Sequence, residues 1–421
     1  MNDRWRRVEG LLLIAAVAAC AAVALHAARG TPRSLAAAML LYALPGWAVM
    51  RVWFGRDDLT PIERVPVAFT LSTCLSTLIY LIAHYAIPRV DAVVMTVALA
   101  GVTGAFALVH ALGSADDSPP RRVSRMEYAA AGALLLLAVL LRFPGLGYSE
   151  FQGDEAANCI DNSARLVLGE KDVLFTSRRP PVQLVQPALT FLLAGSYDEA
   201  LVRLPFALAG VCAVLAMFAL RCRAHGLRVG VVAGLLMAVG GFFVGFSRIV
   251  QYQAFVVLAS VVGLMLLASI PGPDDRRRTW RFLSCGMLVI GFCGLSHFEG
   301  LLVLPAALWL VLAEKLPPRT WGRMKGPILM SFAVFAATVL LFYLPFRLDP
   351  AYERMREYYG ESRIKPAFRF NADILWDLGG LYNTRTYLAF LAIAGIVALL
   401  GRIDWRVRTW LIWFAAPFVT Y

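Results

Sequence analysis

Charged residues are scarce in this sequence, and their scarcity excludes a water-soluble protein. Only 16% of the 421 residues are charged while 59% are hydrophobic, whereas soluble chains are about 25% charged and roughly 45–50% apolar. A soluble domain has no means of burying so much apolar surface. Apolar stretches of about 20 residues recur along the chain, which is the length that a hydrocarbon core of roughly 30 Å requires. The sequence therefore predicts an all-α, polytopic transmembrane helical bundle.

Metal-ligand patterns are also lacking. The seven cysteines form no CxxC motif and no Cys/His ligand spacing; six lie in or beside apolar runs, and only Cys159 falls in a polar segment. His297 and Glu299 are ligand types, but two residues do not make a metal site, and a hydrogen-bonded structural histidine is the alternative. We expect no cofactor, and the ligand spacing does not support a divalent metal.

The net charge is strongly positive, at +12. On a soluble protein this would suggest nucleic acid, but here the arginines lie in short gaps between apolar runs, where basic residues mark cytoplasmic loops. We therefore expect membrane lipids, and no nucleic acid, as partners. With the N-terminus in the cytoplasm, the fifth span delivers the chain from Phe143 onward to the outside. Spans are expected near residues 10–28, 34–54, 65–87, 92–113, 127–142, 202–221, 229–246, 251–270, 282–296, 299–314, 327–346 and 384–401.

Three stretches need a separate interpretation. The apolar run 11–25 resembles the core of a signal peptide, but a second span follows at once, so we expect an uncleaved first helix. The piece 182–194 is expected to be re-entrant or interfacial, because only then do the later basic clusters become cytoplasmic. The run 407–421 ends inside an apolar stretch, and we expect the natural protein to continue beyond it.

The first outward segment carries the strongest chemical candidates, the adjacent carboxylates Asp154 and Glu155. The helix dipole favours carboxylates in a first turn. Simple helix capping is the alternative to catalysis for both residues. Behind them, apolar residues at spacing four predict an outward-facing amphipathic helix lying on the bilayer surface: Ala156, Ile160, Ala164 and Leu168.

The surrounding motifs resemble those of the GT-C glycosyltransferases, in the branch of protein O-mannosyltransferases and lipid A aminoarabinose transferases. The resemblance covers roughly residues 127–346. It rests on Arg142-Phe-Pro-Gly-Leu, Gly153-Asp-Glu-Ala, Leu168-Gly-Glu, Pro180-Pro-Val, Arg203-Leu-Pro-Phe-Ala, and Phe246-Ser-Arg followed by Tyr252. It implies a GT-C-like transmembrane catalytic domain over 127–421, truncated at its C-terminus. Residues 1–115 would then be an N-terminal transmembrane addition of about four spans.

The resemblance further implies transfer of a sugar from a polyprenyl-phosphate carrier to a hydroxyl on a lipid, glycan or protein acceptor. In that family the acidic residue of the first outward loop, here Asp154, is the general base for the attacking hydroxyl. A lipid phosphate is a good leaving group, so one carboxylate and a few cations suffice. Attack from the opposite face inverts the anomeric centre. Glu155 would support Asp154 or orient the acceptor.

Outward-facing cations are the candidates for holding the phosphate, because arginine grips phosphate with two donors. They are Arg203, Arg248 and the later set Arg363, Lys365 and Arg369. Snorkelling at a span end is the alternative for the first two, and an ordinary solvated loop is the alternative for the later set. We also place Tyr252, His297 and Glu299 among the substrate-binding candidates.

Together these features predict a glycosyltransferase of the cytoplasmic (inner) membrane whose active site faces the periplasm. Two other classes stay open. A transporter or flippase of a lipid-linked precursor would need a charge relay within its spans, and neither that nor an inverted repeat is visible in the sequence. A non-catalytic membrane assembly protein, built around the first four spans, is the second alternative.

Overall fold

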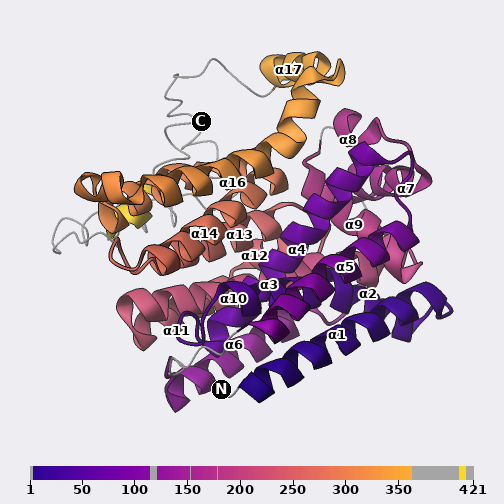
Figure 1. The fold of residues 1–421 in the computed structure, drawn as a ribbon. Helices are drawn as coiled ribbons and strands as arrows, with labels where there is room; N and C mark the ends of the chain where they lie inside the picture. The colour runs from indigo at the N-terminus through magenta and orange to yellow at the C-terminus, as the bar shows by residue number, and fades with distance from the viewer. Residues whose placement is uncertain (1–2, 114–120, 152, 178, 363–406, 414–421) are drawn as a thin grey trace.

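The computed structural model describes residues 3–113, 121–151, 153–177, 179–362 and 407–413, and the regular elements within them are helices (Figure 1). The all-α prediction is confirmed. The first half contains α1 (Asp3–His26), α2 (Thr31–Tyr42), α3 (Leu44–Trp53), α4 (Pro61–Ala86), α5 (Ala92–Leu112), α6 (Arg125–Arg142), the π-helix η1 (Glu155–Ile160), α7 (Asp161–Leu168), α8 (Val173–Thr176) and α9 (Pro181–Ala194). The second half contains α10 (Glu199–His225), α11 (Leu227–Val239), α12 (Gly241–Ser247), α13 (Gln253–Ala268), α14 (Arg276–Ser296), η2 (Phe298–Val303), α15 (Leu304–Trp309), η3 (Leu310–Lys315), η4 (Pro318–Thr320), α16 (Trp321–Leu348) and α17 (Ala351–Ser362).

Seven helical segments in the described part of the chain are long and apolar enough to cross a membrane: α1, α2 with α3, α4, α5, α10, α14, and α16 with η4. α11 and α12 make an eighth if counted together, although the chain bends by 58° between them. α9 and α13 are apolar but shorter. The protein is therefore integral to a membrane, as predicted. The span expected at 384–401 lies outside the described residues, as does most of the final run 407–421.

Local sequence fixes where several of these helices begin. Thr60 and Glu63 form a reciprocal capping box at the start of α4, and Ser124 and Glu127 form one at the start of α6. Each box satisfies two backbone N–H groups that the first helical turn leaves without partners. α2 and α3 are separated by a break just ahead of Pro45, whose ring lacks the N–H that a continuous helix needs.

Ion pairs gather basic segments at one end of the bundle, which we call the basic end. Arg223, in the last turn of α10, donates to Glu63 at the start of α4 at 2.7 Å. Arg278, in the first turn of α14, lies 3.1 Å from Asp57 in the loop before α4. The ends of three helices, distant in sequence, therefore meet at one place.

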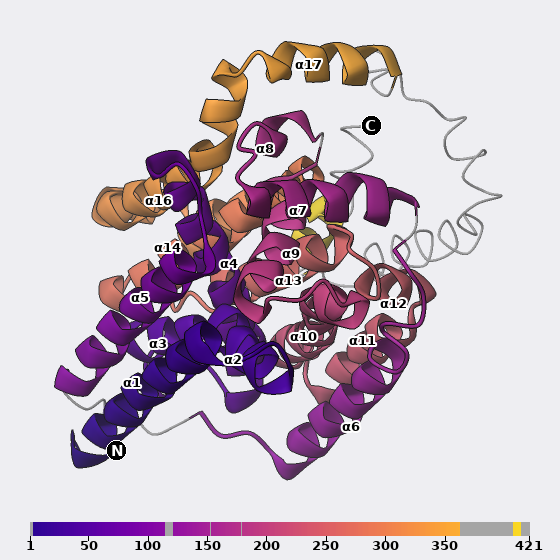
Figure 2. The ribbon, with the colours of Figure 1, turned by 90° about the vertical axis from the view of Figure 1, so that its right-hand side faces the viewer.

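α9 begins and ends at the opposite end, which we call the site end. Gln183, near its start, donates to the carbonyl of Val250 at the α12–α13 junction at 3.1 Å. The carbonyl of Leu193, near its end, accepts from Arg33 at the start of α2 at 2.8 Å. A helix of 14 residues extends only about 21 Å, short of a hydrocarbon core of roughly 30 Å. Both ends of α9 thus contact segments at the site end, and its re-entrant placement in the membrane stays a prediction. Figure 2 shows α7 lying across α9, with α8 beside it.

Candidate functional site

Asp154 immediately precedes η1 and follows Gly153, whose φ of 54° favours glycine. The Asp154 side chain is 60% exposed. Its Oδ1 accepts a hydrogen bond from Asn158 at 2.9 Å and forms an ion pair with Arg179 at 3.0 Å. Its Oδ2 accepts no hydrogen bond from the described residues. The side chain does not cap the helix, so one carboxylate oxygen is held in place and the other is open to a ligand.

Glu155 is the next residue, but it points into the protein and its side chain is only 6% exposed. Both of its oxygens accept from the Arg203 guanidinium, at 2.9 and 2.7 Å. Oε1 also accepts the backbone N–H of Val250 at 2.9 Å. Successive helical residues point roughly a quarter turn or more apart, which explains how adjacent carboxylates come to face solvent and core. Glu155 thus ties η1 to α10 and to the α12–α13 junction.

Arg203 does not present its guanidinium to solvent, and its side chain is 2% exposed. Besides its bonds to Glu155, Arg203 donates through Nη1 to the carbonyls of Leu146 and Ser149, both at 3.0 Å. The Phe151 ring lies 5.2 Å from the guanidinium carbon. Because these donors are already used inside the protein, the geometry favours a structural role over the predicted contact with a phosphate.

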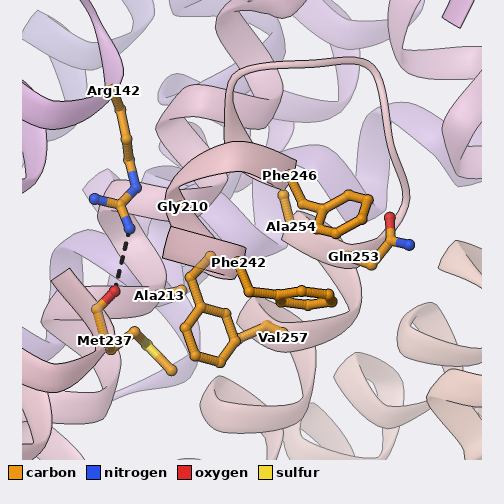
Figure 3. Close-up of a pocket in the computed structure, with 10 residues that line it drawn as sticks. Arg142, Gly210, Ala213, Met237, Phe242, Phe246, Gln253, Ala254 and Val257 are labelled. Atoms are coloured by element: carbon orange, nitrogen blue, oxygen red, sulfur yellow. Dashed lines mark hydrogen bonds between the residues drawn. The ribbon is translucent and has the colours of Figure 1, made fainter. Parts of the chain in front are cut away.

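Arg248 and Arg142 are also engaged with backbone carbonyls. Arg248, which is half-buried, donates to Leu141 at 3.1 Å and to Pro144 at 2.9 Å. Arg142 is fully buried and donates to the carbonyl of Met237 at 3.3 Å, the contact drawn in Figure 3. Beside it, the phenylalanines of α12 line a cavity with room for about one water molecule. The expected phosphate contact of Arg248 would have to compete with these carbonyls.

Gln183 in α9 links η1, the short helix that contains Glu155, to the loop between α12 and α13. Its Nε2 lies 3.0 Å from Sγ of Cys159, 3.1 Å from the carbonyl of Val250 and 3.2 Å from Oε1 of Gln251. Burial raises the pKa of the Cys159 thiol to about 12, so the thiol is protonated at physiological pH. One α9 side chain thereby joins η1 to the segment that also binds Glu155.

Tyr252, His297 and Glu299 are brought together as one cluster. The rings of Tyr252 and His297 stack with centroids 3.7 Å apart and planes within 8°. The Tyr252 hydroxyl donates to Glu299 at 3.3 Å, and Nδ1 of His297 accepts the backbone N–H of Glu299 at 3.2 Å. These bonds are those of a hydrogen-bonded structural histidine. The cluster follows directly on Gln251, so it lies at the site end.

Other predicted site residues lie outside the described ranges, namely Arg363, Lys365 and Arg369. Within the described ranges, no three His, Cys, Asp or Glu side chains gather as a metal ion would require. Arg179 and Asn158 contact Asp154 but were not predicted. The spacing of four residues between Asp154 and Asn158 is a helical-neighbour signal that identifies the second of them. Nothing in the local sequence links Arg179 to Asp154.

The model of the dolichyl-phosphate-mannose-protein mannosyltransferase family matches residues 178–343. The predicted resemblance to GT-C glycosyltransferases is thus confirmed over a segment that is less than half of the chain. The match includes Arg179, Arg203 and Arg248, whereas Asp154 and Glu155 precede it. Neither the curated proteins nor the solved structures yielded a match. The family match and the apolar helices support a membrane glycosyltransferase of the GT-C type.

Proposed function

We propose that this membrane glycosyltransferase transfers a single sugar from a polyprenyl-phosphate carrier to an acceptor hydroxyl, with Asp154 as the general base. The observation that carries the proposal is the environment of Asp154. Its carboxylate is exposed and fixed through Oδ1 by Asn158 and Arg179, and Oδ2 accepts no hydrogen bond from the described part of the chain. A base needs one oxygen within hydrogen-bond reach of the proton that it abstracts, and Oδ2 meets that need.

The transfer balances with one carboxylate. Oδ2 of Asp154 takes the proton as the acceptor oxygen forms its bond to the anomeric carbon. The bond from that carbon to the phosphate oxygen breaks, and the lipid phosphate leaves with the electron pair. Because a phosphate monoester is stable as an anion, no general acid is required. Displacement from the opposite face gives inversion.

Arg179 is the described cation best placed to hold the donor phosphate. The donors of Arg203 and Arg248 are directed at Glu155 and at backbone carbonyls. Arg179 instead contacts Asp154 through the guanidinium nitrogen Nη2, and its side chain is 20% exposed. A guanidinium can bind two phosphate oxygens in parallel. We assign Arg179 to the phosphate, and Tyr252 and Glu299 to the sugar or the acceptor, with His297 as the residue that holds these two in place.

The charge distribution supports the proposed orientation. Basic residues accumulate in cytoplasmic loops, and Arg223 and Arg278 lie together at the basic end. We therefore place the basic end in the cytoplasm and the site end in the periplasm, with the protein in the cytoplasmic membrane. A polyprenyl-phosphate sugar presented at the periplasmic face would then reach Asp154, together with a lipid, glycan or protein acceptor.

A donor-consumption assay tests this function. Membranes carrying the protein are offered a panel of polyprenyl-phosphate sugars, and Asp154→Asn is compared with wild type at equal protein abundance. Loss of the base should slow transfer by about 10²–10⁴-fold. Asp161→Asn is the matched control, because Asp161 is an exposed carboxylate about two helical turns after Asp154. Its activity should stay near wild type. Full activity in Asp154→Asn would refute the assignment.

A further inference from the structure

α9 lies between the first four spans and the candidate site, and all 14 of its residues are buried. It packs against α2, α4 and α5 on the N-terminal side, and against η1 and α7 on the side of the candidate site. A helix enclosed in this way transmits the position of one neighbour to the other, because packed interiors leave little room for independent adjustment.

On the side of the candidate site, α9 is bonded to the segment that carries Asp154. Gln183 contacts Cys159 and the carbonyl of Val250. The carbonyl of Leu184 accepts from the hydroxyl of Ser163 in α7 at 2.9 Å. Two successive α9 residues therefore fix η1, α7 and the α12–α13 junction relative to one another.

On the N-terminal side, α9 is bonded to α4 and α2. Gln186 Nε2, which has two N–H donors, lies within hydrogen-bond distance of three acceptors: the carbonyl of Thr73 at 3.2 Å, the Ser76 hydroxyl at 3.3 Å and the Thr77 hydroxyl at 2.9 Å. One turn further, the hydroxyls of Thr190 and Tyr42 are 2.7 Å apart. The first four spans thus bind α9 through polar groups in an otherwise apolar interface.

These bonds are not needed to satisfy the groups around Gln186. The Ser76 and Thr77 hydroxyls already donate to the carbonyl of Thr73, at 3.1 and 2.8 Å. Oε1 of Gln186 is buried without a hydrogen-bond partner among the described residues. An apolar side chain of similar size would leave no donor stranded and would remove one unsatisfied acceptor. What the amide adds is a fixed register between α9 and α4.

We propose that the first four spans form the seat of α9 and that Gln186 is a positioning residue for the transfer reaction. Gln186 fixes the position of α9 along α4 and so fixes Gln183. Gln183 in turn positions η1, the segment that follows Asp154. The inference rests on the proposed function of Asp154. It gives residues 1–115 a part in positioning the base through α9.

The test compares Gln186→Leu with wild type in the full-length protein, normalised to folded protein. Misplacing the base should lower kcat for donor consumption by at least about tenfold, with the donor KM unchanged within about twofold. Labelling of Cys159 by N-ethylmaleimide, followed by mass spectrometry of its peptide, gives a readout that needs no activity. Its rate should rise in Gln186→Leu because Gln183 shifts away from the thiol that it contacts in wild type.

Thr338→Val is the matched control, because it removes a buried hydroxyl that bonds only within α16. It should change neither kcat nor labelling. Tyr42→Phe, which deletes one hydroxyl opposite Thr190, is a milder second variant and should shift both readouts in the direction of Gln186→Leu. Wild-type kcat and labelling in Gln186→Leu and Tyr42→Phe would overturn the proposal. If wild type consumes no donor, the proposed function fails, while the labelling comparison still decides whether α9 is seated by the first four spans.

Discussion

Arg142 and Arg248 join α6 to the α11–α12 pair by hydrogen bonds that run in opposite directions. Arg142, the last residue of α6, donates to the carbonyls of Ala238 and Met237 at the end of α11. Arg248, just after α12, donates to the carbonyl of Leu141 in the last turn of α6. The last carbonyls of a helix have no partner within the helix, and this pair of arginine contacts satisfies some of them at the C-terminal ends of α6 and α11. It also fixes the start of the segment that leads to Asp154.

Gly210 in α10 packs closely against Arg142 and Ser247, beside these hydrogen bonds. A Cβ at this position would lie 2.5 Å from Cβ of Ser247 and 2.8 Å from Nε of Arg142. Gly210→Ala should therefore lower the free energy of unfolding by about 1–3 kcal/mol, the usual cost of overpacking. The measurement is the unfolding midpoint of the purified protein in detergent. Gly245→Ala is the control, since a Cβ there meets no atom within 4 Å. Equal midpoints for the two variants would contradict the prediction.

The apolar runs were sufficient to predict the helical bundle, because a hydrocarbon core demands long apolar helices. Charge patterning also predicted that α9 does not cross it. α9 is apolar and, at 14 residues, shorter than the candidate spans, and its placement in the membrane stays a prediction. The partners of individual charges were not predictable. Arg203 was expected to face a phosphate, but the structure pairs it with Glu155, which lies 48 residues earlier. Spacing alone also could not show which of Asp154 and Glu155 faces solvent, because the answer depends on how η1 docks on α9 and α10.

The buried Glu155–Arg203 pair provides a test of whether Arg203 has a structural role or binds a phosphate. Arg203→Gln leaves a buried carboxylate without its cation and should lower the free energy of unfolding by roughly 3–5 kcal/mol. The double variant with Glu155→Gln should recover part of that loss, because neither side chain is then charged. Unfolding midpoints of the wild type, two single variants and the double variant give the coupling energy. If Arg203→Gln is as stable as wild type, Arg203 is not structural and the phosphate role regains support.

Cys159 gives a prediction with a defined dependence on pH. Burial raises the pKa of its thiol from 9.0 to about 12, with the nearby carboxylates of Asp154 and Glu155 adding to the rise. The thiol's contribution to stability is therefore fully present below pH 9 and is lost as pH rises through about 12. Because the thiolate is the reactive form, iodoacetamide should leave native Cys159 unmodified at pH 8 and modify it after denaturation. Rapid modification of the native protein would show that η1 is open.

A substitution of Arg179 distinguishes its two possible roles, which are binding the donor phosphate and orienting Asp154. If it binds the donor phosphate, Arg179→Gln removes a charge-assisted contact of about 1.5–3 kcal/mol, and the donor KM should rise by at least about tenfold while the acceptor KM stays constant. Arg165→Gln is the control, because Arg165 is an exposed arginine of α7 that pairs with Glu170. If kcat falls and both KM values are unchanged, Arg179 acts through Asp154 alone. The phosphate must then be held by cations elsewhere, and Arg363, Lys365 and Arg369 are further candidates from the sequence.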